Sequence, residues 1–243
     1  MIAAFKVFFR SVGDVWFSLI GYVACNLVVA AGVVFLPLGV LSIFAGLGLN
    51  SGILLLTAVV MVVGIGAPLV LGLVQVTMEA LRYAERPEVL HLLQAARVNM
   101  AAAWKLATVQ VLATLVIFGS LLFYLLQAQA WSLPLVVVTG AIAWTWLGMM
   151  IYMASLMLRA NKSLRLGLRN SAVAVLRYPF FTATLIVLCA AVTLLSCVVV
   201  PLMALVTISL LVVVGVRATN WVLVQEGVLP DPSKVELEEG NSV

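Results

Sequence analysis

Polar side chains recur at helical spacing within the long apolar stretches of this sequence. In the first stretch, Asp14, Ser18, Tyr22 and Asn26 follow one another at intervals of four residues, which places them on one face of a helix. Such a face can bind a polar solute in a cavity between helices, or it can hold helices together by interhelical hydrogen bonds. Packing is the favoured hypothesis, and a polar pocket open to the cytoplasm is the alternative. The residues of this candidate pocket are Asn26, Gln75, Glu79, Gln110, Thr145 and Tyr152.

The sequence contains no familiar pattern for catalysis or metal binding. It has one histidine, His91, and three cysteines that lack CxxC spacing. The motifs of phosphate-binding loops, dinucleotide-binding folds, zinc proteases and serine hydrolases are all missing. We therefore predict a protein that is not an enzyme and uses no cofactor or metal. A membrane enzyme that modifies lipid is the rival hypothesis.

The composition predicts that lipid is the solvent for much of the chain. Apolar residues make up 65% of the 243 residues, charged residues only 9%, and the mean hydropathy is +1.26. Soluble domains contain about 45–50% apolar and about 25% charged residues. The chain has too little polar surface to cover a water-facing globule, so we predict an all-α, polytopic transmembrane helical bundle.

The lengths of the apolar stretches predict about six spans in a single domain, residues 15–217. A helix needs roughly 20 apolar residues to cross a hydrocarbon core of about 30 Å. Four spans are predicted at residues 15–36, 52–78, 106–126 and 133–157. Residues 180–216 are too long for one crossing, so we predict two spans that meet near Pro201, with five spans in total as the alternative. Pro68 is expected to kink the second span, because proline removes a backbone hydrogen bond.

The basic residues predict the orientation, because Lys and Arg are retained on the cytoplasmic side. All 13 lie before the first span, after the last, or in the connections that follow the second and fourth spans. Six spans place them all in the cytoplasm, whereas five would place Arg217 and the tail outside. We predict a multi-pass protein of the plasma membrane, with a cytoplasmic N-terminal segment, residues 1–14, and a cytoplasmic, disordered acidic tail, residues 218–243.

The two basic connections predict short amphipathic helices at the cytoplasmic interface, the second with Ser163 as its N-cap. Their basic residues can reach lipid phosphates, so we expect the bilayer as a partner, with anionic headgroups at Arg97, Arg165 and Arg169. A transporter complex is a further candidate partner, and nucleic acid is excluded because the basic residues share no water-exposed face. The apolar faces comprise Val89, Leu90, Leu92, Leu93, Ala96 and Met100 in the first helix, and Leu164, Leu168, Ala172, Val175 and Leu176 in the second.

No ionisable residue falls near the middle of a predicted span. Charged groups inside a bilayer are costly and normally mark proton relays, ion sites or voltage sensors. This distribution argues against a proton-coupled pump. Glu79 stands about one turn inside the cytoplasmic boundary of the second span, and we expect it to pair with Arg82.

Several short motifs are arranged along most of the chain in the order found in one known family. They are Asn26 in a Leu/Val-rich first span, Gly66-Ala67-Pro68 in the second, the basic exit Arg82–Arg86, the helix with Trp104-Lys105, and the helix at 161–179 before a final apolar hairpin. In these features the chain resembles the YesL-like family of bacterial integral membrane proteins. The resemblance implies a multi-pass protein that assists solute uptake, often of carbohydrates, and it carries over no catalytic residue.

These observations lead to one predicted function and two alternatives. We predict a non-enzymatic, transport-associated or scaffolding membrane component. The first alternative is a solute transporter with a polar pocket between the helices, and the second is the permease subunit of an ATP-driven importer.

Overall fold

The structure is a computed structural model that describes residues 2–32, 37, 39–42, 57, 60–83, 86–127, 129, 131–198 and 206–230. This part of the chain is helical and contains no strand, which confirms the predicted all-α class. Five helices are apolar and long enough to cross a membrane, and a bent pair of helices would make a sixth span. The predicted turn at Pro201, and with it the choice between five and six spans, lies outside the described residues.

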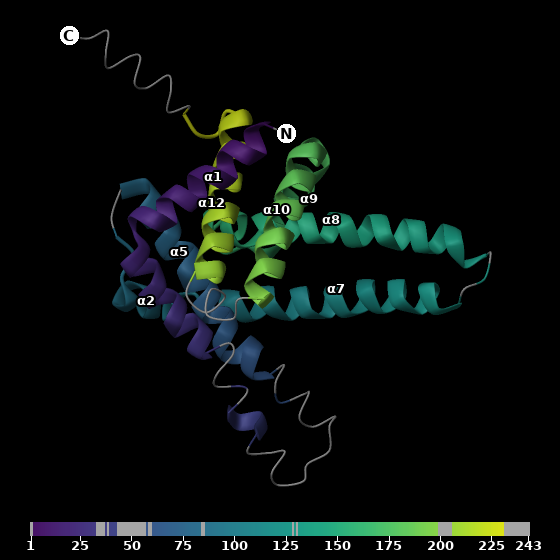
Figure 1. Ribbon diagram of the computed structural model, residues 1–243, viewed down its shortest axis with the longest axis horizontal. Coiled ribbons are helices and arrows are strands. Elements are labelled where there is room, and N and C mark those ends of the chain that lie inside the picture. The colour runs from purple at the N-terminus through teal and green to yellow at the C-terminus, as the bar shows by residue number, and fades with distance from the viewer. Residues whose placement is uncertain are drawn as a thin grey trace.

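Figure 1 shows that the helices form two regions. The long helices α7 and α8 form an antiparallel hairpin that extends away from the other helices. We call residues 111–142 of this pair the distal hairpin, and the remaining described helices the body. In chain order the helices are α1 (Ile2–Phe17), α2 (Leu19–Ala30), the π-helix η2 (Val62–Gly66), α5 (Ala67–Tyr83), α6 (Val89–Val98), α7 (Met100–Gln127), α8 (Ser132–Arg159), α9 (Leu164–Arg177), α10 (Pro179–Val198) and α12 (Ile208–Gln225).

The N-terminal apolar segment is not one straight helix. Helix α1 ends before Ser18, and α2 leaves at an angle of 93°. Helix α1 runs without a break through the predicted boundary between a cytoplasmic segment, residues 1–14, and a span that begins at residue 15. Ala4 and Phe8 of the supposed segment pack in the core, since their apolar side chains find partners on α12 and α10. Residues 33–36 of the predicted span lie outside the described residues.

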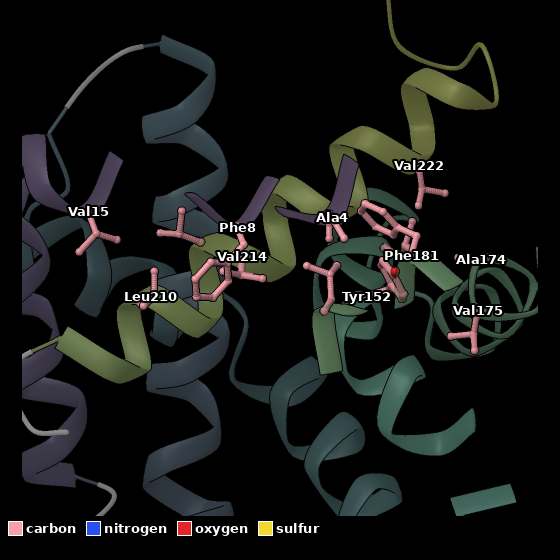
Figure 2. Close-up of a cluster of buried hydrophobic side chains, with 14 of the residues drawn as sticks. Ala4, Phe8, Val15, Tyr152, Ala174, Val175, Phe181, Leu210, Val214 and Val222 are labelled. Carbon is pink, nitrogen blue, oxygen red and sulfur yellow. The ribbon is translucent and has the colours of Figure 1, made fainter. Parts of the chain in front are cut away.

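Three clusters of buried apolar side chains hold the body together. The largest joins α1, α8, α9, α10 and α12, and Figure 2 shows Phe8, Tyr152, Phe181 and Val214 converging in it. A second cluster joins α2, α5 and α6, and a third joins α5 to the body ends of α7 and α8. Helices that are distant in sequence therefore share each cluster, and α5 contributes to two of them.

Helix α5 begins with the irregular backbone that the sequence predicts. The π-helix η2 precedes it, and in a regular α-helix the carbonyl of Gly64 would accept a hydrogen bond from the amide of residue 68. Proline has no amide hydrogen, so Pro68 cannot supply that bond. The indole Nε1 of Trp104, on α7, donates to the Gly64 carbonyl instead, at 2.9 Å. This bond fixes the first turns of α7 against the irregular segment.

The two predicted amphipathic helices are confirmed as α6 and α9, and Ser163 is the N-cap of α9. Their buried faces are rotated from the predicted stripes. In α6, Leu92, Ala95 and Ala96 are buried whereas Leu90 is exposed. The rotation follows from close packing on α5, because a Cβ at Gly72 would lie only 2.8 Å from the Ala96 amide nitrogen. In α9 the buried residues are Gly167, Ser171, Ala174 and Val175, while Leu176 is exposed.

The last helix continues beyond the predicted start of the tail at residue 218. Helix α12 ends at Gln225, and Trp221 stacks on Phe181 with ring centroids 4.0 Å apart. Glu226 then forms an ion pair with Arg177 at the end of α9. The predicted disordered tail is therefore wrong for residues 218–226, because aromatic stacking and an ion pair fix them to α9 and α10. Residues 231–243 lie outside the described part.

Candidate functional site

The six residues of the predicted pocket lie in separate places. Gln75 and Glu79 line a groove between α5 and α6, whereas Gln110 lines an internal cavity. Thr145 lines an apolar recess between α7 and α8, and its hydroxyl donates to the Ala141 carbonyl of its own helix at 2.9 Å. The other two, Asn26 and Tyr152, are buried and hydrogen-bonded to neighbouring helices.

The internal cavity has a volume of about 190 Å³ and lies among α5, α7, α8, α10 and α12. Its lining is mostly aliphatic, and Gln110, Ser155 and Cys189 are its polar members. Drug-sized ligands occupy pockets of about 300–1,000 Å³. The cavity lies below that range, and its mostly apolar lining does not favour a polar solute.

A charged pair crosses the body between α1 and α12. Arg217 lies near the middle of the apolar helix α12, and its Nε donates to Oδ2 of Asp14. Each side chain is 25% exposed. The expectation that no ionisable group lies near the middle of a span is therefore wrong for Arg217. The predicted span ends at residue 216, whereas helix α12 continues to Gln225 and therefore includes Arg217.

Helix α2 is joined to the start of α12 by neutral hydrogen bonds. Oδ1 of Asn26 accepts from the backbone amide of Ser209 at 3.1 Å and from its hydroxyl at 3.2 Å. The Ser209 hydroxyl also lies 3.3 Å from the Tyr22 carbonyl oxygen. Asn26 thus accepts a hydrogen bond from a backbone amide in the first turn of α12, where backbone amides have no acceptor within the helix. We call this set the α12 seam: Asp14, Tyr22, Asn26, Ser209 and Arg217.

The bend at Ser18 explains how both ends of the seam form at once. Along a straight helix, Asp14 and Asn26 would be separated by about 18 Å. Their partners Arg217 and Ser209 are separated by only about 12 Å along α12. The bend shortens the first distance, so the polar face predicted from the spacing of four residues meets α12 at both ends.

A chain of side-chain amides runs from the α6–α7 junction to the groove between α5 and α6. Nδ2 of Asn99 donates to Oε1 of Gln75, and Nε2 of Gln75 donates to Oε1 of Glu79 at 2.8 Å. Asn99 is fully buried, and its Oδ1 accepts no hydrogen bond from the described residues. Sequence reasoning missed Asn99, whose only signal was a polar residue between two apolar helical runs.

The groove itself opens to the surface and has a volume of about 450 Å³. The predicted ion pair between Glu79 and Arg82 is wrong, because the Glu79 carboxylate binds Gln75 and Arg82 lies over the Tyr83 ring, 5.4 Å from its centroid. The residues that line the groove are Gln75, Glu79, Tyr83, His91, Gln94, Ala95 and Val98.

Two further polar contacts join helices of the body to each other and to Glu226. The Tyr152 hydroxyl and Oγ1 of Thr182 are 2.9 Å apart in a buried hydrogen bond between α8 and α10. The Tyr178 hydroxyl donates to Oε1 of Glu226 at 2.8 Å. Desolvation, that hydrogen bond and the negative charge of Glu226 raise the pKa of the Tyr178 hydroxyl. Tyr178 therefore keeps its proton and remains a donor at physiological pH.

Comparison with known proteins adds no identification. No protein family, curated protein or solved structure matches the chain. Among the described residues there is also no group of three or more His, Cys, Asp or Glu side chains that could hold a metal ion. The resemblance to the YesL-like family therefore stays a prediction.

Proposed function

We propose that the protein is a non-enzymatic membrane component that assists or scaffolds a transport process rather than carrying a solute through itself. The observation that supports this proposal is the way polar side chains bind one another between helices. Asn26 binds Ser209, Tyr152 binds Thr182, and the six predicted pocket residues do not share a cavity. Small and polar residues that pair in this way are typical of helix packing in membranes.

Uptake by proteoliposomes tests the proposal. We expect the purified protein to give no uptake of labelled sugars above empty liposomes. We also expect Asn26→Leu to lower the melting temperature, because it leaves the backbone amide of Ser209 without its acceptor. Thr145→Val is the matched control, since that hydroxyl binds only its own helix. Uptake that Gln75→Leu abolishes at an unchanged melting temperature would contradict the proposal.

A solute transporter is the second candidate, and the α12 seam favours it. The ion pair joins Arg217, near the middle of the apolar helix α12, to Asp14 of the helix pair α1–α2, which is bent by 93°. Charged groups within spans and interrupted helices both mark substrate pathways in transporters. This function requires uptake that is lost in Asp14→Asn while the protein remains folded and monodisperse. The permease alternative instead requires co-purification with a nucleotide-binding ATPase.

We further propose that the protein resides in the plasma membrane with both termini in the cytoplasm. The basic residues Arg97, Arg165 and Arg169 are exposed on α6 and α9, where they are available to lipid phosphates. Reporter domains fused after Trp131 and after Val243 should report outside and inside, respectively. The opposite pair of signals would reverse the orientation.

A further inference from the structure

The groove between α5 and α6 has one carboxylate in its lining, the exposed side chain of Glu79, and two cationic side chains contact residues of that lining. We propose that it binds the phosphoethanolamine headgroup of a phospholipid, with the ammonium group at Glu79 and the phosphate at Arg82 and Lys162. The inference concerns a lipid ligand and does not rest on the proposed transport-associated role.

The position of the groove suits a headgroup. Glu79 lies in the last turns of α5, an apolar helix long enough to span a membrane, and Tyr83 ends that helix. Tyrosine side chains are enriched at the boundary between hydrocarbon and water. The opposite wall comes from α6, which is too short to span. The groove volume of about 450 Å³ lies within the range of ligand pockets.

The Glu79 carboxylate is held in a position where it can accept hydrogen bonds from an ammonium group. The buried Asn99 amide donates to Oε1 of Gln75, which fixes the Gln75 amide so that its nitrogen donates to Glu79. Oε2 of Glu79 accepts no hydrogen bond from the described residues. His91 and Gln94 supply further polar groups from α6. A primary ammonium has three donors, whereas the trimethylammonium of choline has none.

The edge of the groove carries two cations suited to a phosphate. Arg82 lies three residues after Glu79, on the same helix face, and stacks over Tyr83. Nζ of Lys162 donates to the carbonyl of Val98 at 3.3 Å. Tyr83 and Val98 both line the groove, so each cation contacts one residue of the groove lining.

These cations have no acidic partner in the described part of the chain, where the ion pairs are Arg177–Glu226 and Arg217–Asp14. The positive charges of Arg159 and Arg82 also repel each other. A bound phosphate would offset this repulsion between like charges. Basic sites between helix ends on the cytoplasmic side are known to hold lipid headgroups.

Native mass spectrometry of the full-length, delipidated protein tests the proposal with three lipids of identical acyl chains. These lipids are phosphatidylethanolamine, phosphatidylcholine and phosphatidylglycerol. We expect phosphatidylethanolamine to bind about tenfold more tightly than phosphatidylcholine, because only the primary ammonium can donate charge-assisted hydrogen bonds to Glu79. Glu79→Gln should abolish most of that preference. Arg82→Gln should weaken binding of both lipids to a similar extent.

Two matched controls keep the charge changes away from the groove. Glu88→Gln removes an exposed carboxylate beside α6, and Arg10→Gln removes an exposed cation on α1. Neither residue lines the groove, so both variants should retain the preference. His91→Phe, at an exposed position, should fill the groove and reduce binding of all three lipids without altering the fold, as checked by circular dichroism.

The outcome of each arm is decisive. A preference for phosphatidylethanolamine over phosphatidylcholine that survives in Glu79→Gln overturns the proposal, as does equal binding of these two lipids by the unaltered protein. A separate arm uses free phosphoethanolamine as a competitor. Competition at equal concentration assigns the same headgroup chemistry to a soluble ligand, and competition only at large excess assigns it to the lipid.

Discussion

The α12 seam and the distal hairpin show two different ways of placing helices in an apolar solvent. In the seam, an ion pair and several hydrogen bonds join α1 and α2 to α12. In the distal hairpin most large side chains are exposed, including Leu115, Phe123 and Val137. Figure 1 shows this hairpin projecting beyond the other helices. Its exposed apolar surface suits contact with acyl chains or with other membrane proteins.

Glycines in the body and in the distal hairpin also differ in how closely neighbouring helices approach them. A Cβ at Gly72 would meet the backbone of α6 at 2.8 Å, and one at Gly215 would meet the Ile151 carbonyl oxygen at 2.8 Å. In the distal hairpin, a Cβ at Gly119 or Gly140 would meet nothing within 4 Å. The body is therefore specified by close and polar contacts, whereas the distal hairpin is specified mainly by its apolar composition.

Breaking the ion pair of the seam should have the largest effect. Arg217→Leu leaves the Asp14 carboxylate without a partner between α1 and α12. We expect a loss of about 3 kcal/mol in the free energy of unfolding, near the lower end for a buried pair because both side chains are 25% exposed. Reversible unfolding in detergent micelles, followed by circular dichroism, measures this loss.

The double variant Asp14→Leu and Arg217→Leu sharpens the comparison. Apolar replacement of a whole buried pair is often neutral, so most of the lost stability should return. If the single variant loses less than about 0.5 kcal/mol, the pair behaves like a pair on the surface and the seam does not specify the body.

Alanine at matched glycines should change stability in opposite directions. Gly72→Ala forces α6 away from α5 and should cost about 1–3 kcal/mol, as in overpacked cores. Gly140→Ala meets no neighbour and should raise stability by up to about 1 kcal/mol, because alanine favours helix over glycine. The same unfolding measurement compares the two. Equal losses would show that the distal hairpin is packed as closely as the body.

The sequence predicts the helical class and most helices because both depend on local apolar runs. Helix α8, the irregular start of α5 and the N-cap at Ser163 all follow from residues close together in the chain. The bend at Ser18 does not, because Ser18 is no strong helix breaker. It depends on partners on α12 that lie almost two hundred residues away.

The candidate site was predicted only in part for the same reason. Asp14 and Asn26 both bind α12, but the bend at Ser18 places them on two helices and not on one helix face. Gln75 and Glu79 share a face of α5 and are joined by a hydrogen bond. Which helix each face meets depends on tertiary packing. The sequence does not reveal the role of Arg217, because that role depends on α12 continuing to Gln225. It does not reveal the role of Asn99, because that role depends on the packing of α6 on α5.

The smallest effect is expected at a hydrogen bond between a side chain of the distal hairpin and a side chain of the body. Nε1 of Trp146 donates to Oγ1 of Thr114 at 3.0 Å, and Trp146 is only 7% exposed. Thr114→Val keeps the shape and removes the acceptor, so we expect a loss of about 0.6 kcal/mol, typical of a hydrogen bond between membrane helices. Ser120→Ala is the control, because that hydroxyl binds only its own helix. A loss as large as that of Arg217→Leu would mean that α7 and α8 are held together by this bond, and the contrast between the two regions would fail.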